Sequence, residues 1–495
     1  MTGGGGHVPG DARARALMVL GTASHVGKSI ITAALCRIFR DDGIDVAPFK
    51  AQNMALNSFA TIDGLEIGRA QATQARAARL EPTVDMNPVL LKPSSDVASQ
   101  VVLNGRILGN LTGAELYARR PELTVHIRAA YDRLASRHQL IVLEGAGSPV
   151  EMNLKQHDMV NLAMAEYADA TCILVADIDR GGVFAQVVGT FALLEPRERS
   201  RFSGFIINRF RGDPALLGDA TQFLEEKTGQ RCHGVVPWLR DIGIDEEDSL
   251  PDERPVQRDG LRIAIVLLPS LANFTDFDPL FRIAGIAPFY ARSASELKDA
   301  DAIILPGSKN SVRDLRSLRE RGIDLLLKTT PTPILGICGG FQMLGRAIED
   351  PHGTESEEHS VEGLGLLDVV TTMAPVKTTR QVVARFGDVA IRGYEIHVGE
   401  TRRGDVAPML QLDGIGADGA ISSDGRILGT YVHGLFDDPA GALAIVNHFR
   451  ALLAMPPLDR SAIAASVDAY DRLAAHVRAH VDIDALHAAA GRSAA

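Results

Sequence analysis

The sequence has 495 residues, which is too long for one ordinary hydrophobic core and predicts two or three domains. An apolar fraction of 46% is typical of a globular protein, and a formal net charge of −11 argues against nucleic acid as the main partner. The four cysteines are scattered with no CxxC pair, so the sequence suggests neither a disulfide framework nor a zinc site, and a reducing cytoplasm fits best.

The chain begins with a glycine-rich stretch, residues 1–14, which we interpret as a flexible leader and not as a signal peptide. No apolar run approaches the length of a membrane span, so no membrane partner is expected. From residue 15 to 244, short apolar runs alternate with helical stretches. Runs that are apolar on both faces are typical of parallel strands covered by helices, so this part predicts an α/β domain with a mostly parallel sheet.

The loop after the first predicted strand has the features of a phosphate-binding P-loop. It runs from Gly21 through Thr22 to Gly27, Lys28 and Ser29, and a helical stretch follows it. Backbone N–H groups would hold the phosphates of ATP, Lys28 would neutralise them, and the Ser29 hydroxyl would bind Mg²⁺. Five residues separate the two glycines, one more than in the common pattern.

Polar side chains follow the later strands of this domain. Glu144 ends an apolar run and is the expected carboxylate partner of Mg²⁺. Asp177 and Asp179 end another strand, where Arg180 would meet an anionic group, although a solvated turn explains these charges nearly as well. Asn208 ends a further strand and is a candidate for binding the adenine edge.

Residues 245–260 are acidic and rich in proline, which predicts a surface linker between two domains. A second series of strands and helices occupies residues 261–450 and predicts another α/β domain. Residues 451–495 turn alanine-rich, with apolar positions at helical spacing from 463 to 490. We expect them to form a packed helical tail.

Cys338 is the candidate nucleophile of the second domain. An apolar run breaks at Gly336-Ile-Cys-Gly-Gly340 and resumes at helical spacing, which predicts a strand that turns sharply into a helix. Such a nucleophile elbow exposes the thiol and leaves backbone N–H groups free to bind an oxyanion. An isolated cysteine is more often a small core residue, but the flanking pattern favours the elbow.

A cysteine nucleophile needs a base that later returns a proton to the leaving ammonia, and histidine suits both tasks. His433 follows an apolar strand and is the best candidate, and His397 is its rival on another strand-like run. A lone strand histidine is usually structural, so the residues alone support at most one catalytic histidine.

Five long segments resemble those of cobyric acid synthases, and the resemblance extends from about residue 21 to 449. The first half is also similar to dethiobiotin synthetase, whose phosphate loop has the same longer spacing. The five segments are residues 48–58, 66–71, 86–93, 176–184 and 207–213.

The second half is similar to class I glutamine amidotransferases, which join a cysteine elbow to a later Gly-Thr-x-x-His strand. This resemblance selects His433 over His397, assigns the oxyanion hole to Gly307 and Gly339, and gives Gln342 a role in holding glutamine. Most members carry Glu two positions after the histidine, where this chain has Leu435. Without that carboxylate we expect slow glutamine hydrolysis unless the other domain is occupied.

The resemblance implies a P-loop synthetase domain followed by a glutamine amidotransferase domain. The implied reaction is ATP- and glutamine-dependent amidation of the b, d, e and g carboxylates of adenosylcobyrinic acid a,c-diamide, giving adenosylcobyric acid for cobalamin biosynthesis. Its partners would be L-glutamine and the adenosylated corrinoid, with Mg²⁺ and no tightly bound cofactor. A homo-oligomer is left open. The candidates for holding substrate are Lys50, Gln52, Asn53, Asp177, Asp179 and Arg180.

Two other functions are compatible with parts of the sequence. Cobyrinic acid a,c-diamide synthase shares both domain types, although the segments at 50–58 and 177–184 favour the later enzyme. A nucleotide-switched partitioning ATPase resembles the first half only, and such a switch has no need of an elbow cysteine.

Overall fold

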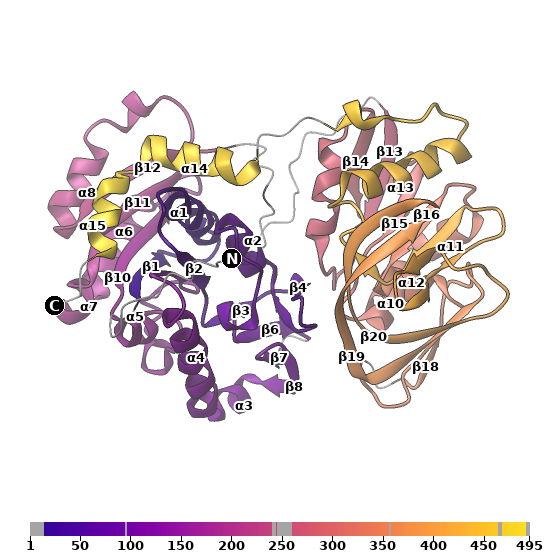
Figure 1. Ribbon diagram of the computed structural model, residues 1–495, viewed down its shortest axis with the longest axis horizontal. Coiled ribbons are helices and arrows are strands. Elements are labelled where there is room, and N and C mark those ends of the chain that lie inside the picture. Colours follow the sequence, from indigo (N-terminus) through magenta and orange to yellow (C-terminus); the bar gives the residue numbers. More distant parts are fainter. Residues whose placement is uncertain are drawn as a thin grey trace, which may run out of the picture.

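The computed structural model describes residues 14–94, 97–239, 244, 260–355, 358–463 and 468–491. The described chain forms two α/β domains, one on each side of Figure 1. Apart from Ala14 and Gly260, the expected leader and acidic linker lie outside the described residues. No helix within the described ranges is long and apolar enough to cross a membrane.

The first domain is built on a parallel six-stranded sheet in the order β12-β11-β10-β1-β9-β2. Its inner strands are buried on both faces because their middle residues are apolar, as expected for a sheet covered by helices. The strands are β1 Arg15–Gly21, β2 Val46–Phe49, β9 Leu140–Glu144, β10 Thr171–Asp177, β11 Phe202–Phe210 and β12 Arg231–Pro237.

The helices of this domain lie between the strands in sequence, in the alternation that a parallel sheet requires. Buried apolar side chains form two large clusters in this domain. The helices are α1 Lys28–Asp41, α2 Arg69–Ala77, α3 Gly113–Ala118, α4 Arg120–Ala135, α5 Leu162–Ala168, α6 Val183–Leu193, α7 Pro196–Arg199 and α8 Ala220–Thr228.

Between β2 and α4 the chain also forms two small sheets. One has four strands in the order β3-β6-β7-β8, and the other is the antiparallel pair β4 and β5. Their strands are β3 Gln52–Met54, β4 Ser58–Ala60, β5 Glu66–Gly68, β6 Val89–Pro93, β7 Ala98–Leu103 and β8 Arg106–Thr112.

The second domain contains another six-stranded sheet, in the order β14-β13-β15-β16-β24-β23, in which only β23 is antiparallel. The strands are β13 Leu261–Val266, β14 Ile286–Ala291, β15 Ala302–Leu305, β16 Ile334–Ile337, β23 Ala420–Ile421 and β24 Ile427–Thr430. The helices are α9 Ala294–Leu297, α10 Ser311–Glu320, α11 Ile323–Thr329, α12 Gly339–Leu344 and α13 Pro439–Leu452, and a 3₁₀ segment, η4, spans Phe274–Arg282.

A second sheet of this domain is dominated by a long antiparallel hairpin, β19 and β20. Tyr394 on β20 pairs with His433 on β25, so the hairpin lies directly beside the candidate histidine. The strands are β17 Ala347–Glu349, β18 Ser360–Glu362, β19 Val369–Phe386, β20 Val389–Arg403, β21 Leu410–Leu412, β22 Gly416–Asp418 and β25 Val432–His433.

The C-terminal helices return to the first domain. In Figure 1 the yellow helices α14, Ala469–His480, and α15, Ile483–Ala490, lie on the side of α1, whereas α13 lies on the second domain. Leu473 and Leu486 are buried in one apolar cluster with α1 because both helices carry an apolar stripe. The continuous helical pattern expected from 463 is interrupted at Val481, which bridges to Gly234.

Candidate active site

The P-loop lies at the carboxyl end of β1, where α1 begins at Lys28. Gly27 has a φ of +94°, a left-handed conformation that favours glycine, and a Cβ there would lie 2.1 Å from the amide nitrogen of Asn208. The ammonium of Lys28 donates to the backbone carbonyls of Ala23 at 2.8 Å and Gly147 at 3.2 Å. The loop is therefore closed around a buried lysine.

The Ser29 hydroxyl and the Glu144 carboxylate meet beside this loop. β1 and β9 are neighbours in the sheet, so the start of α1, which follows β1 through the P-loop, lies beside the end of β9, and Ser29 donates to Glu144 at 2.8 Å. Lys50 pairs with the same carboxylate at 2.7 Å, and Gln74 also donates to it. Burial alone would raise the pKa of Glu144, but the Lys50 ammonium lowers it, so the carboxylate is ionised at neutral pH.

The Ser29 and Glu144 oxygens are hard ligands of the kind that Mg²⁺ prefers. Within the described residues no group of three His, Cys, Asp or Glu side chains could hold a metal ion. That finding is compatible with Mg²⁺, which takes most of its ligands from water and substrate phosphate. The donor set fits a magnesium ion that arrives with a nucleotide.

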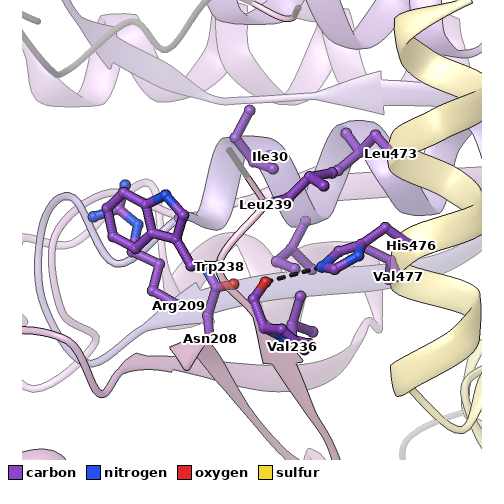
Figure 2. A pocket seen from close by; sticks show the side chains of 12 residues that line it. Ile30, Asn208, Arg209, Val236, Trp238, Leu239, Leu473, His476 and Val477 are labelled. Carbon is purple, nitrogen blue, oxygen red and sulfur yellow. Dashed lines mark hydrogen bonds between the residues drawn. The ribbon is translucent and has the colours of Figure 1, made fainter. Parts of the chain in front are cut away.

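A pocket opens next to the P-loop between the first domain and the C-terminal helix α14. Figure 2 shows Asn208 and Trp238 on one side of it and His476 on the other, with a hydrogen bond of 2.9 Å between His476 and the Pro237 carbonyl. The Asn208 amide donates to the Val26 carbonyl at 2.9 Å. Asn208 thus lines the pocket and also holds the P-loop by a hydrogen bond. The sequence did not predict this second role.

The other candidates of the first domain are partly engaged in ion pairs. Asp177 pairs with Arg209 at 3.2 Å, and Asp179 pairs with Arg211 at 2.7 Å. Arg180 has a side chain that is 57% exposed and lies 3.7 Å from Asp177.

Thr22 donates to Gln186 at 3.0 Å, so it is anchored to α6. Gln52 and Asn53 lie on β3, and the Asn53 amide donates to Gln71 of α2 at 3.1 Å.

Cys338 stands at the turn between β16 and α12, with a φ of +50°. This left-handed conformation is costly for a non-glycine residue and is typical of functional turns. The turn also requires the two glycines that follow, because a Cβ on Gly340 would lie 2.0 Å from the Leu305 carbonyl and one on Gly339 would crowd Ser308. The elbow geometry agrees with the sequence pattern.

His433 is held by a carboxylate that lies far away in the sequence. Its Nδ1 donates to Oδ2 of Asp276 at 2.6 Å, and both side chains are 2% exposed. Burial alone would lower the pKa of His433, but the Asp276 carboxylate and a hydrogen bond to Cys338 raise it to about 10. The imidazole is therefore protonated at neutral pH and faces the thiol.

Asp276 is the residue that sequence reasoning missed. It lies in η4 after β13, in a segment with a second aspartate at position 278 and no recognisable spacing to His433. The sequence left the residue that orients His433 unidentified, and in the structure a carboxylate from a different loop lies at that nitrogen. Leu435 instead is buried in the apolar core of the domain.

His397 occupies a different position from His433, although both line one cavity with Cys338. Its Nδ1 bonds to the Gly399 carbonyl at 2.8 Å, and its ring stacks on Tyr431 with centroids 3.8 Å apart. Its other nitrogen lies 3.4 Å from Glu395. These contacts fit a side chain that forms the wall of the cavity.

Most of the residues that line the cavity around Cys338 have polar side chains, and they come from both domains. Gly307 and Gln342 line it, and Gln342 accepts a hydrogen bond from the Ser311 hydroxyl at 2.5 Å. Lys92 and Gln100, which belong to the first domain, also face it. The remaining lining residues are Ala272, Asn273, Ser308, Lys309, Glu355, Lys377, Ile396 and Val398.

Two family matches divide the chain into the same two α/β domains. Residues 17–251 match the CobQ/CobB/MinD/ParA nucleotide binding domain, and residues 262–441 match the CobB/CobQ-like glutamine amidotransferase domain. A solved glutamine amidotransferase is matched over 40% of this chain and 100% of its own, at 20% identity and a TM-score of 0.31, a similarity too low to support an inference.

Whole-length relatives agree with both matches. The chain is 46% identical to the cobyric acid synthase of Syntrophobacter fumaroxidans, over 95% of this chain and 98% of the relative. It is 47% identical to that of Klebsiella pneumoniae subsp. pneumoniae, over 96% and 97%. It is 44% identical to that of Caldanaerobacter subterraneus, over 95% and 97%. The chain therefore belongs to the cobyric acid synthase family of glutamine-hydrolysing ligases.

Proposed function

We propose that this enzyme amidates the b, d, e and g carboxylates of adenosylcobyrinic acid a,c-diamide, using ATP and ammonia from glutamine. The observation that carries the proposal is the Cys338, His433 and Asp276 arrangement on the same chain as a complete P-loop. A cysteine that attacks as its thiolate beside a protonated histidine suits glutamine hydrolysis, and a P-loop suits carboxylate activation by ATP.

In the synthetase domain, ATP would transfer its γ-phosphoryl group to a substrate carboxylate, giving an acyl phosphate and ADP. Lys28 and the loop N–H groups from Gly21 to Gly27 would hold the phosphates, and Asn208 would face the base. Ser29 and Glu144 would hold Mg²⁺, which supplies positive charge to the phosphates when bound. Lys50 keeps Glu144 ionised for that purpose.

In the glutaminase domain, the Cys338 thiolate would attack the amide carbon of glutamine while Gly307 and Gly339 stabilise the oxyanion. Protonated His433 would give its proton to the leaving ammonia, leaving a thioester that water then hydrolyses to glutamate. Asp276 would hold the imidazole in the orientation this transfer needs. Gln342 would help to position glutamine.

Ammonia would then attack the acyl phosphate, form the amide and release phosphate. Lys50, Gln52, Asn53, Asp177, Asp179 and Arg180 remain our candidates for contacting the corrinoid carboxylates or the phosphoryl group. All four cysteines are unpaired, so we propose that the enzyme acts in a reducing compartment such as the cytoplasm.

The test is a product count. The purified chain, with ATP, Mg²⁺ and glutamine, is expected to convert adenosylcobyrinic acid a,c-diamide to the fully amidated acid, as followed by mass spectrometry. If it instead converts cobyrinic acid itself and stops at the diamide, the enzyme is a cobyrinic acid a,c-diamide synthase. A Cys338→Ala variant is expected to make product with ammonium salts and none with glutamine.

A further inference from the structure

The loop that carries Asp276 is held from the other domain. The Asn57 side-chain carbonyl accepts from the Phe274 backbone N–H at 3.1 Å, and Asn273 accepts from the Ser58 backbone N–H at 2.9 Å. All of these residues are buried. The two bonds run in opposite directions across the interface, so the start of η4 is fixed to β4 of the synthetase domain.

A buried arginine of the synthetase domain makes the second connection. Arg69 is 2% exposed and donates to the Tyr394 hydroxyl at 3.4 Å and to Asp437 at 3.1 Å. The Tyr394 hydroxyl in turn donates to Asp276 at 3.2 Å. The Tyr394 ring also stacks on His433, with centroids 5.4 Å apart and an interplanar angle of 17°. Arg69 therefore contacts Tyr394, which supports His433 both by stacking on its ring and by bonding to Asp276.

Arg69 opens the helix α2, and the same helix reaches the nucleotide site. Gln74 donates to the Glu144 carboxylate and, at 3.5 Å, to the Ser29 carbonyl. Arg69 and Gln74 are five positions apart on the helix, a rise of about 7.5 Å at about 1.5 Å per residue. The short helix α2 thus contacts Glu144 beside the P-loop through Gln74 and the support of the glutaminase histidine through Arg69.

We infer that Arg69 is a positioning residue through which the synthetase domain sets the orientation of His433, so that glutamine hydrolysis responds to the occupancy of the ATP site. The inference rests on the proposed function. Ligand binding that moves Glu144 would move α2, and Arg69 would pass that shift to Tyr394 and Asp276. A coupling of this kind is the change in free energy at one site that occupancy of the other site produces.

The variants Arg69→Met and Tyr394→Phe test the connection at two points. The second removes only a hydroxyl, so it keeps the ring stacking and remains informative if the first variant does not fold. Arg76→Met is the matched control, because Arg76 is an exposed arginine of the same helix and its guanidinium, like that of Arg69, lies over the Phe59 ring. Each variant is assayed with glutamine and, separately, with ammonium salts.

We expect the glutaminase kcat to fall about tenfold or more in both variants, with the KM for glutamine unchanged, because neither residue lines the cavity. Stimulation by ATP plus the corrinoid is expected to disappear, and ammonia-dependent synthesis is expected to stay within about twofold of wild type. Arg76→Met should behave as wild type. The double variant should be no worse than either single variant, because both act through one path.

Equal losses with glutamine and ammonia would overturn the inference, since Arg69 would then act at the synthetase site. Unchanged stimulation in both variants, or additive effects in the double variant, would overturn it as well. Failure of the proposed function is distinguishable, because the wild-type enzyme would then make no amide with either nitrogen donor.

Discussion

Oδ2 of Asp276 lies 2.6 Å from Nδ1 of His433, although the two residues are 157 positions apart and belong to different elements. The contact replaces the carboxylate that most class I glutamine amidotransferases carry two positions after the histidine. Its consequence is a histidine that stays protonated well above neutral pH.

Replacing Asp276 by Asn should impair glutamine hydrolysis alone. The amide keeps the shape but loses the charge that orients the imidazole, so we expect the glutaminase kcat to fall on the order of 10²- to 10⁴-fold. The pKa of His433, now about 10, should fall, which moves the alkaline limb of the pH profile to lower pH. Ammonia-dependent synthesis should persist. Asp299→Asn, at an exposed position, serves as control.

The stability of the second domain should depend on pH through His433. Its pKa is raised from 6.5 to about 10 on folding, so its contribution is fully present below pH 6.5 and is lost as pH rises through 10. Denaturant unfolding of wild type and His433→Gln should therefore show a stability difference that shrinks across this window. A constant difference from pH 6 to 10 would contradict the raised pKa.

Restoring the usual carboxylate by Leu435→Glu should not improve the enzyme. Leu435 is 1% exposed within the apolar core, and Asp276 already occupies Nδ1 of His433. A buried unpaired carboxylate is expected to cost several kcal/mol of unfolding free energy or to stay protonated. Leu435→Met, which keeps the volume, should cost less than about 1.5 kcal/mol. A faster glutaminase in Leu435→Glu would sink the assignment of Asp276.

Gly27→Ala should abolish ATP-dependent synthesis with either nitrogen donor. The new Cβ would lie 2.1 Å from the Asn208 amide nitrogen, so the P-loop or its brace must shift. A displacement of about 1 Å at a reacting group is enough to reduce the rate about 100-fold. Gly43→Ala is the control for backbone strain alone. Gly43 has a φ of +84°, as unfavourable for alanine as that of Gly27, but nothing lies within 4 Å of its Cβ position. Nucleotide binding by calorimetry should be lost only in the first variant.

The docking of the C-terminal helices should stabilise the first domain. Leu486 of α15 is fully buried in the cluster that includes α1, so Leu486→Ala should cost about 2–5 kcal/mol of that domain's unfolding free energy. Leu325→Ala, at a side chain that is 67% exposed, should have little effect. Denaturant unfolding is measured with and without nucleotide. The transition that nucleotide shifts to higher denaturant concentration is that of the first domain, which carries the nucleotide site. Equal midpoints for the two variants would show that the docking contributes nothing.

Parts of the site that depend on local pattern were predictable from the sequence. The P-loop and the Cys338 elbow each join a strand to a helix within a few residues, so apolar runs and glycines located them. Glu144 was found because side chains that end neighbouring parallel strands meet at one edge of the sheet. The two α/β domains followed from the alternation of strands and helices.

Other parts of the fold and of the site depend on contacts between segments that lie far apart in the sequence. No local sequence pattern predicts such contacts. Asp276 stands in a segment with a second aspartate, so only the fold identifies which carboxylate meets His433. The sequence indicated helices near the C-terminus, but amphipathic spacing does not say which domain an apolar stripe will cover. The same holds for Arg69, whose partners Tyr394 and Asp437 lie more than 300 residues away.

The return of α14 and α15 to the first domain has a consequence for biosynthesis of the chain. During translation the apolar face of α1 stays uncovered until residue 490 has left the ribosome. The second domain is synthesised before these helices and can fold first. The glutaminase domain is thus an insertion within the synthetase domain, and a single cut between residues 239 and 261 would not separate two intact enzymes.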